Sequence, residues 1–372
     1  MEILNLIQCL NLGGMEQSSY ILMKNTQGQG IYWQVQSITP AGVGKEILTN
    51  TNIPVFDNPY KGKFGYKSHL SLKNKISNFS GDIILVTGAT LTGCLSVKFA
   101  PCKKVLAIHF CHKLGSLNLL KWRIFYRIFQ NDYQAIIYSS PYILEEAKKI
   151  APYLQHKFYL IENSIERYSN TTDTEREIAR TNLGIATNVF VIGNAGWLID
   201  RKRFDVFLEV CAKVSKYRPN FLFLIAGDGP LRYELEKLAT KLGIDNKVKW
   251  IGWQKDLSDF YKSLDLLLFN SNSDAFGRTI LEAMSYGIPV VASVIEGGAD
   301  SIIVHEENGY LIREHDIDKL AKLSLNLIKN KDLYFQFKTR SLDIVKARFN
   351  TEKFTGKYLD IFEKILNLSN KS

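Results

Sequence analysis

The sequence lacks any apolar run as long as the roughly 18 to 20 residues that a membrane-spanning helix needs. Its first segment, Met1–Leu10, has no basic stretch and no small-residue cleavage site, so it is typical of a β-strand and not of a signal peptide. We therefore expect a cytoplasmic protein, either free or peripheral on the inner face of the cytoplasmic membrane.

Cysteine is also scarce. The five cysteines are an odd number, and they have neither CxxC nor zinc-ligand spacing. This usage indicates small buried hydrophobic residues in a reducing compartment. We find no convincing DxD-type motif that would offer carboxylates to a divalent ion. We expect no cofactor and no metal.

Acidic residues are few in the first half of the chain. Residues 1–169 hold 18 Lys and Arg against 10 Asp and Glu, whereas residues 170–372 hold 29 against 27. A basic half favours an anionic partner such as membrane lipid, a phosphorylated acceptor or nucleic acid, although a basic surface kept for solubility gives the same pattern. No recognised nucleic-acid-binding motif is present, so we expect no nucleic-acid partner.

Short apolar runs alternate with longer helical patterns, which is typical of parallel sheets built from βαβ units. In the first half the expected strands are Ile3–Leu10, Ile31–Ile38, Asp82–Thr87, Lys104–His109, Ala135–Ser139 and Phe158–Ile161. In the second half they are Val189–Asn194, Phe221–Ala226, Val248–Gly252, Leu266–Phe269, Val290–Ala292 and Gly309–Leu311. The polar stretch Glu166–Asp173 suits a linker. We predict an α/β protein with two Rossmann-like domains, at 1–168 and 188–350, and a C-terminal helix of about 353–372 that packs back on the first.

The most informative segment is Asn270–Ser293, NSNSDAFGRTILEAMSYGIPVVAS. We expect a strand to end at Phe269, a polar loop to follow, and a helix to begin near Phe276–Gly277. A helix start offers unpaired backbone N–H groups and a positive dipole end, which suit a diphosphate. Gly277 would let that backbone come close to a ligand.

Two carboxylates flank this helix start. Asp274 precedes the helix, where it could bond to sugar hydroxyls, and Glu282 lies four residues after Arg278, where it could accept bonds from ribose hydroxyls. The alternative is that Asp274 only caps the helix and Glu282 lies on a solvated helix face.

The run from Asp274 through Phe276, Gly277 and Arg278 to Glu282 resembles the donor-site signature of glycosyltransferase family 4, two acidic residues with seven between them. The resemblance implies a retaining enzyme of the GT-B fold, with two Rossmann-like domains whose parallel sheets face each other across a cleft. The family usually has Glu at the first acidic position, so Asp274 is one methylene shorter.

Further landmarks of the family follow in the same order along the chain. Gly13-Gly14-Met-Glu16 resembles the glycine loop near the donor and acceptor, although an ordinary strand-to-helix turn has the same composition. His109 closes a strand and matches the family's histidine, at the sheet edge where open α/β sheets bind ligands. A structural histidine is the alternative, and His112 is the nearby competitor for the role.

A basic segment matches the place where the family has Gly-Arg and then a Lys five residues later, both of which contact the donor diphosphate. Lys202 falls on the Lys position, and Trp197 occupies the Arg position. Arg201 or Arg203 could substitute because guanidinium binds phosphate bidentately, or the segment could be a solvated basic turn. Gly227, after a buried strand, is expected near the nucleotide.

The resemblance implies that the second domain binds a nucleotide sugar and that the first binds a glycan or lipid-linked acceptor, as in lipopolysaccharide or capsule synthesis. The implied catalytic residues are His109, Asp274 and Glu282, and the implied donor-binding residues are Gly13, Gly14, Arg201, Lys202, Gly227, Phe276, Gly277 and Arg278. Two alternatives stay open: a nucleotide-sugar epimerase or hydrolase on the same fold, and a non-catalytic sugar- or lipid-binding relative.

Two basic segments of the first domain suggest where an anionic partner binds. In the helical stretch Leu117–Phe129, Arg123 and Arg127 share a narrow polar arc between apolar residues, which suits either an anionic membrane interface or a packed Rossmann helix. A second basic run is expected in a mobile loop and comprises Lys61, Lys63, Lys67, Lys73 and Lys75.

Overall fold

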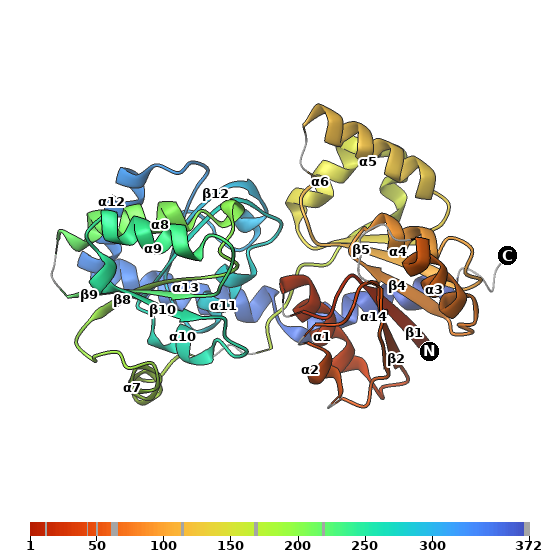
Figure 1. The fold of residues 1–372 in the computed structure, drawn as a ribbon, viewed down its shortest axis with the longest axis horizontal. Coiled ribbons are helices and arrows are strands. Elements are labelled where there is room, and N and C mark those ends of the chain that lie inside the picture. Colours follow the sequence, from red (N-terminus) through yellow and green to blue (C-terminus); the bar gives the residue numbers. More distant parts are fainter. Residues whose placement is uncertain are drawn as a thin grey trace. The chain divides into compact units, whose positions relative to one another are not determined.

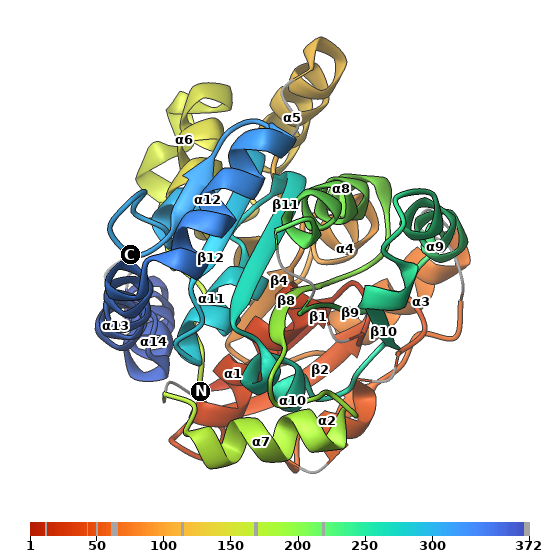
Figure 2. The same cartoon turned by 90° about the vertical axis from the view of Figure 1, so that its left-hand side faces the viewer.

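The computed structural model describes residues 1–11, 13–42, 44–49, 51–60, 66–112, 115–166, 170–217 and 220–367. The chain folds into two compact units, one of Met1–Glu166 with Phe349–Ser372 and one of Arg167–Arg348. Each unit has one parallel sheet with helices packed on it (Figures 1 and 2). The roles assigned to the two domains, acceptor binding and donor binding, stay predictions.

The first unit is built on a seven-stranded sheet of order β3-β2-β1-β4-β5-β6-β7. Its strands are β1 (Glu2–Ile7), β2 (Tyr32–Ser37), β3 (Val55–Phe56), β4 (Ile83–Thr87), β5 (Lys103–Ile108), β6 (Ala135–Tyr138) and β7 (Phe158–Leu160). Its helices are α1 (Gly14–Thr26), α2 (Lys45–Thr49), α3 (Tyr66–Ser77), α4 (Leu91–Ser96), α5 (Ser116–Phe129), α6 (Pro141–Ile150), the 3₁₀ helix η1 (Pro152–Lys157) and α14 (Thr351–Asn367).

Helix α14 packs on this unit beside α1, although it comes from the end of the chain (Figure 1). Alternate residues of β1, β4 and β5 share one core with both helices, because side chains one residue apart on a strand point to opposite faces. The ring of Phe362 meets Trp33 edge to face at 6.2 Å in that core.

The second unit is built on a six-stranded sheet of order β10-β9-β8-β11-β12-β13. Its strands are β8 (Phe190–Ala195), β9 (Phe221–Ala226), β10 (Val248–Gly252), β11 (Leu266–Asp274), β12 (Val290–Gly297) and β13 (Tyr310–Ile312). Its helices are α7 (Asp173–Asn182), α8 (Phe204–Ser215), α9 (Arg232–Lys241), α10 (Ser258–Ser263), α11 (Arg278–Ser285), α12 (Ile317–Lys329) and α13 (Lys331–Arg348), with the 3₁₀ helices η2 (Asp200–Lys202), η3 (Asp245–Lys247) and η4 (Ala299–Ser301).

Helices α8, α9 and α12 share one apolar core with the second sheet and lie above it in Figure 1. Phe207 of α8 and Phe223 of β9 are fully buried there. In both sheets every strand pairing is parallel, so the carboxyl ends of the strands lie at one edge. That edge carries the loops that hold the candidate site residues.

Three local expectations need correction. Strand β11 continues past Phe269 to Asp274, where a polar loop was expected. Helix α7 occupies part of the break between the expected domains, because Thr172 and Glu175 form a reciprocal capping box at its start. Lys67, Lys73 and Lys75 lie on helix α3 and not in a loop, whereas Lys61 and Lys63 lie outside the described residues.

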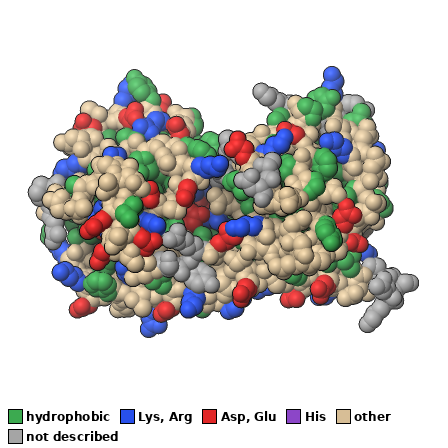
Figure 3. Space-filling view, turned by 90° about the horizontal axis from the view of Figure 1, so that it is seen from below, with side chains coloured by type: hydrophobic (Ala, Val, Ile, Leu, Met, Phe, Trp, Pro, Cys, Tyr) green, Lys and Arg blue, Asp and Glu red, His purple; other side chains and the backbone are tan. Residues whose placement is uncertain are grey.

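No described helix is both long and apolar enough to cross a membrane. On the face drawn in Figure 3, basic and acidic side chains are interspersed and do not gather into one large patch of either sign.

Candidate functional site

The carboxyl end of β11 positions Asp274. Pairing with β12 continues through Asn270↔Ser293 and on to Asp274↔Gly297, so the ends of the two strands satisfy each other's backbone groups. Gly297 allows this approach, because a Cβ there would lie 1.7 Å from the carbonyl oxygen of Asp274. Asp274 is therefore held by a strand and not by a loose loop.

The turn after Asp274 starts helix α11. Gly277 is the N-cap of that helix with φ 98°, a left-handed conformation that favours glycine. One carboxylate oxygen of Asp274, Oδ1, accepts hydrogen bonds from the backbone N–H groups of Gly277 at 2.9 Å and of Phe276 at 3.4 Å. Asp274 thus holds the turn before the helix, and the alternative that it is the N-cap is wrong, because Gly277 occupies that position.

The other oxygen of Asp274, Oδ2, accepts a hydrogen bond from the Lys202 ammonium at 2.6 Å. The two side chains keep only 13% and 15% of their surfaces exposed. Burial raises the pKa of Asp274, but the charge and hydrogen bond of Lys202, the charge of Arg201 and the Phe276 N–H together outweigh burial and hold that pKa below its usual range. Lys202 also lies over the ring of Phe269, 5.0 Å from its centroid.

The neighbouring arginines are engaged with other groups. Arg201 donates to the carbonyl oxygen of Ser273, and Arg203 forms an ion pair with Asp205 at 2.7 Å. Trp197, at the position where the family has Arg, is 57% exposed. Among these basic residues, Lys202 alone pairs with Asp274.

Glu282 lies on α11, where only 15% of its side chain is exposed. Its carboxylate pairs with Arg278 at 2.8 Å and accepts a hydrogen bond from the Tyr261 hydroxyl at 2.6 Å. The Tyr261 ring stacks on Tyr286 with centroids 5.5 Å apart. Burial first, and then the nearby Glu282 charge, raise the pKa of Tyr261 well above its usual value, so it stays a donor.

Tyr261 is a residue that the sequence analysis missed. It lies on α10, 21 residues before Glu282, and no spacing rule connects the two helices. Only the packing of α10 beside the sheet brings its hydroxyl to that carboxylate.

Gly227 follows β9 with φ 132°, and a Cβ there would lie 1.9 Å from the carbonyl oxygen of Gly196. The loops after β8 and β9 therefore come together only because residue 227 is glycine. Gly196 in turn lies beside the side chain of Lys202, because a Cβ on Gly196 would lie 3.9 Å from Cε of that lysine. The structure thus brings Gly227, Lys202 and Asp274 to one edge of the second sheet.

The other predicted site residues belong to the first unit. Gly13 is the N-cap of α1 just after β1, and Gly14 is the first residue of the helix. Burial raises the pKa of Glu16 in the first turn of α1, and its carboxylate accepts a hydrogen bond from the Cys9 thiol at 3.3 Å. Because β1 and β5 are separated only by β4, Gly13 and His109 lie at the same sheet edge.

The structure separates the two candidate histidines. Both ring nitrogens of His112 have partners, Glu146 at 3.2 Å and the Tyr126 hydroxyl at 2.8 Å, and the ring is fully buried. In contrast, the buried Nδ1 atom of His109 has no hydrogen-bond partner among the described residues. Burial lowers the pKa of His109 to about 4, so its imidazole is neutral at physiological pH.

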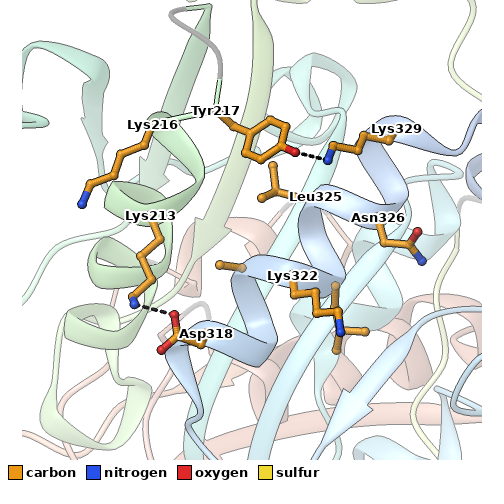
Figure 4. A pocket seen from close by; sticks show the side chains of 10 residues that line it. Lys213, Lys216, Tyr217, Asp318, Lys322, Leu325, Asn326 and Lys329 are labelled. Carbon is orange, nitrogen blue, oxygen red and sulfur yellow. Dashed lines mark hydrogen bonds and ion pairs between the residues drawn. The ribbon is translucent and has the colours of Figure 1, made fainter.

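A groove lies apart from the predicted site residues. This groove of about 760 Å³ between α8 and α12 is lined by lysines that include Lys213 and Lys329, which are bonded to Asp318 and Tyr217 (Figure 4). None of the predicted site residues lines that groove. In the described ranges, no three His, Cys, Asp or Glu side chains are grouped so that they could hold a metal ion.

Part of the second unit matches a known family. Residues 175–342 match the family model described as glycosyl transferases group 1. Lipopolysaccharide core biosynthesis glycosyltransferase LpsE of Rhizobium meliloti is 29% identical over 195 residues, which cover 52% of this chain and 56% of that protein. N-acetyl-alpha-D-glucosaminyl L-malate synthase of Bacillus anthracis is 30% identical over 165 residues, covering 44% and 43%. The chain thus spans about half the length of the curated relatives it matches.

Solved structures match the whole described architecture. HepE of Anabaena, crystallised with UDP and glucose, has a TM-score of 0.83 at 23% identity and covers 98% of this chain and 99% of its own. WaaG, a glycosyltransferase involved in lipopolysaccharide biosynthesis, has a TM-score of 0.76 at 17% identity, with 99% of both chains covered. The expected fold and the resemblance are both confirmed: the chain has the GT-B fold, and its residues 175–342 match the glycosyl transferases group 1 model.

Proposed function

We propose that this chain is a retaining glycosyltransferase that moves a sugar from a nucleotide-sugar donor to a glycan or lipid-linked acceptor in cell-surface polysaccharide or lipopolysaccharide synthesis. The observation that carries the proposal is the meeting of Lys202, Asp274 and the start of α11 at one sheet edge, with Glu282 on the same helix. These are the groups that a diphosphate, a sugar and a ribose would need.

The costly step of such a transfer is the departure of the nucleoside diphosphate, because negative charge builds on its oxygens. Lys202 and the positive end of the α11 dipole would stabilise that charge. A preorganised contact of this kind stabilises the transition state by about 3 to 4 kcal/mol. We propose that no divalent metal takes part.

The two acidic residues have different roles in this proposal. Glu282, oriented by Tyr261 and Arg278, accepts hydrogen bonds from the ribose hydroxyls. Asp274 accepts a hydrogen bond from the donor sugar. Neither is an acid or base of the kind that glycosidases use, where two carboxyl groups flank the scissile bond.

Names of relatives support a uridine nucleotide as the donor carrier. HepE was crystallised with UDP-glucose, and a relative from Escherichia coli, 28% identical over 183 residues, is named a UDP-Gal:alpha-D-GlcNAc-diphosphoundecaprenol galactosyltransferase. We propose a UDP-hexose or UDP-N-acetylhexosamine donor and a lipid-linked acceptor for this chain.

The first unit is proposed to bind the acceptor. The unpartnered Nδ1 of His109 supports this role, since a buried polar atom without a partner is costly and a sugar hydroxyl would satisfy it. The glycine turn at Gly13 and Gly14 starts α1 at the same sheet edge.

Helix α5 supports a position on the inner face of the cytoplasmic membrane. Four aliphatic side chains that share one face of the helix are exposed, by 75, 55, 49 and 47% respectively: Leu117, Leu120, Ile124 and Ile128. Arg123 and Arg127 flank this row and line a hollow of about 310 Å³ with Tyr153. Exposed apolar residues flanked by basic ones are typical of helices that lie in an anionic membrane interface.

A transfer assay tests the proposed function. The purified protein is incubated with a panel of UDP-sugars and N-acetylglucosaminyl diphosphoundecaprenol, and the product linkage is read by nuclear magnetic resonance. We expect a product whose anomeric configuration is that of the donor, and an inactive Glu282→Ala variant. A Glu236→Ala variant, which breaks the Arg232–Glu236 pair on α9, is the matched control with normal activity.

Other outcomes of the assay would contradict the proposal. Conversion of the donor without an acceptor would favour an epimerase or hydrolase. Donor binding without any turnover, across acceptors with and without a lipid, would favour a non-catalytic binding relative.

A further inference from the structure

Both oxygens of the Asp274 carboxylate already accept hydrogen bonds in this structure. Oδ1 accepts from the N–H groups of Phe276 and Gly277, and Oδ2 accepts from Lys202. Oδ2 keeps one lone pair that a sugar hydroxyl can use, but as long as Lys202 stays there its ammonium is the charged donor to that oxygen. The anion that would draw Lys202 away is the donor diphosphate.

Asp274 and a donor diphosphate would also compete for the Lys202 ammonium. Lys202 has a close anionic partner, and a diphosphate would have to replace that partner or share the ammonium with it. The guanidinium of Arg203 is paired with Asp205, and residue 197 is Trp. Arg201 donates to the neutral carbonyl oxygen of Ser273 and keeps its charge, so it could share a diphosphate with Lys202.

We propose that Asp274 makes this site distinguish the intact nucleotide sugar from the nucleoside diphosphate product, an inference that rests on the proposed function. When either ligand binds, Lys202 turns to the diphosphate and Asp274 Oδ2 loses its partner. The intact donor replaces that partner with a sugar hydroxyl, whereas the product offers none.

The burial of Asp274 makes the loss of a hydrogen-bond partner at Oδ2 costly. The Asp274 side chain is 85% covered, so an unpartnered oxygen there is poorly solvated and costly. The product therefore binds against that cost, and the donor does not. After transfer, the Lys202–Asp274 ion pair re-forms and helps to expel the nucleoside diphosphate.

An Asp274→Asn variant tests this inference by calorimetry. The amide oxygen can still accept from Gly277, but the charge that competes for Lys202 is gone. We expect UDP to bind about tenfold more tightly than to the wild type, with a much smaller change for the UDP-sugar. In steady-state turnover, we expect stronger inhibition by UDP.

Two further variants make the test specific. In a Lys202→Gln background, Asp274→Asn should no longer tighten UDP binding, because the competition needs both charges. Asp318→Asn removes the partner of Lys213 in the remote groove of the same unit, and it should leave the affinity for UDP unchanged. Far-ultraviolet circular dichroism and thermal melting check that each variant is folded.

The results separate two failures. If the wild type binds UDP and Asp274→Asn binds it equally or more weakly, Asp274 does not compete with the product and the inference is wrong. If the wild type binds no nucleoside diphosphate and no nucleotide sugar of any base, the proposed function fails and the inference fails with it.

Discussion

At the scale of single residues, the sequence predicts Asp274 and Glu282 as site residues from their spacing. It does not predict which side chains contact them. Lys202 lies 72 residues before Asp274, and Tyr261 comes from another helix than Glu282. Contacts of such sequence separation depend on how the helices pack on the sheet, and local patterns do not encode them.

Tyr261→Phe is expected to weaken donor binding. The change removes the hydroxyl that fixes Glu282, so kcat/KM for the donor should fall about three- to tenfold, mostly through KM, and the free energy of unfolding should fall by about 1 kcal/mol. Steady-state kinetics and urea denaturation measure the two effects. Tyr286→Phe alters the other ring of the stacked pair, whose hydroxyl bonds to Ser258, and should leave the donor KM near that of the wild type. Equal kinetics for both variants would remove Tyr261 from the site.

His109 predicts a pH dependence of stability. Burial lowers its pKa to about 4, whereas a histidine of the unfolded chain titrates near 6.5. Between these values the unfolded state binds more protons, so the free energy of unfolding falls as the pH falls through this window, by up to about 3 kcal/mol, and is unaffected above it.

Urea denaturation of the wild type and of His109→Gln from pH 7 to pH 4 measures this contribution. The stability difference between the two proteins should shift against the wild type as the pH is lowered. A His156→Gln variant, changed at an exposed position, is the control. Parallel curves for the wild type and His109→Gln would show that this imidazole is not buried in its neutral form.

At the scale of helices and strands, alternation of apolar runs predicted most of both sheets. It ended β11 too early, because Asn, Ser and Asp are depleted in strands and the run after Phe269 has that composition. It also ended β12 too early, at Ala292, although Val294 and Ile295 favour a strand. Those residues are held extended by mutual pairing that the composition does not reveal. Helix α7 was missed for a different reason, since its sequence has only two apolar residues, Ile178 and Ala179, and its start is fixed by the Thr172 capping box.

Helix α5 predicts binding to anionic membranes. Ile124→Ser removes an aliphatic side chain from the centre of the exposed row, so the partition of the protein into phosphatidylglycerol vesicles at low salt should fall about tenfold. Ile178→Ser, on α7 of the second unit, removes an isoleucine of similar exposure, 56% against 49% for Ile124, and is the matched control. Vesicle flotation measures both. A wild type that does not float with anionic vesicles would remove the membrane proposal.

At the scale of the whole molecule, the chain builds two sheets of the same parallel architecture, and the predicted residues divide between them. The second unit holds the residues proposed to bind the diphosphate and the nucleoside, and it contains the segment that matches the family. The first holds Gly13, Gly14 and His109. Sequence alone indicated this division because each motif follows a recognisable strand. It could not indicate that Asp274 is paired with Lys202, since both residues were expected to contact the ligand.

A crystal structure of the protein soaked with UDP tests the central claim most directly. The account predicts that the diphosphate lies at the carboxyl edge of the second sheet, within hydrogen-bonding distance of the Lys202 ammonium and against the first turn of α11, with the ribose at Glu282. A UDP molecule bound elsewhere, such as in the lysine-lined groove between α8 and α12, or Lys202 still paired with Asp274 beside an empty sheet edge, would contradict it.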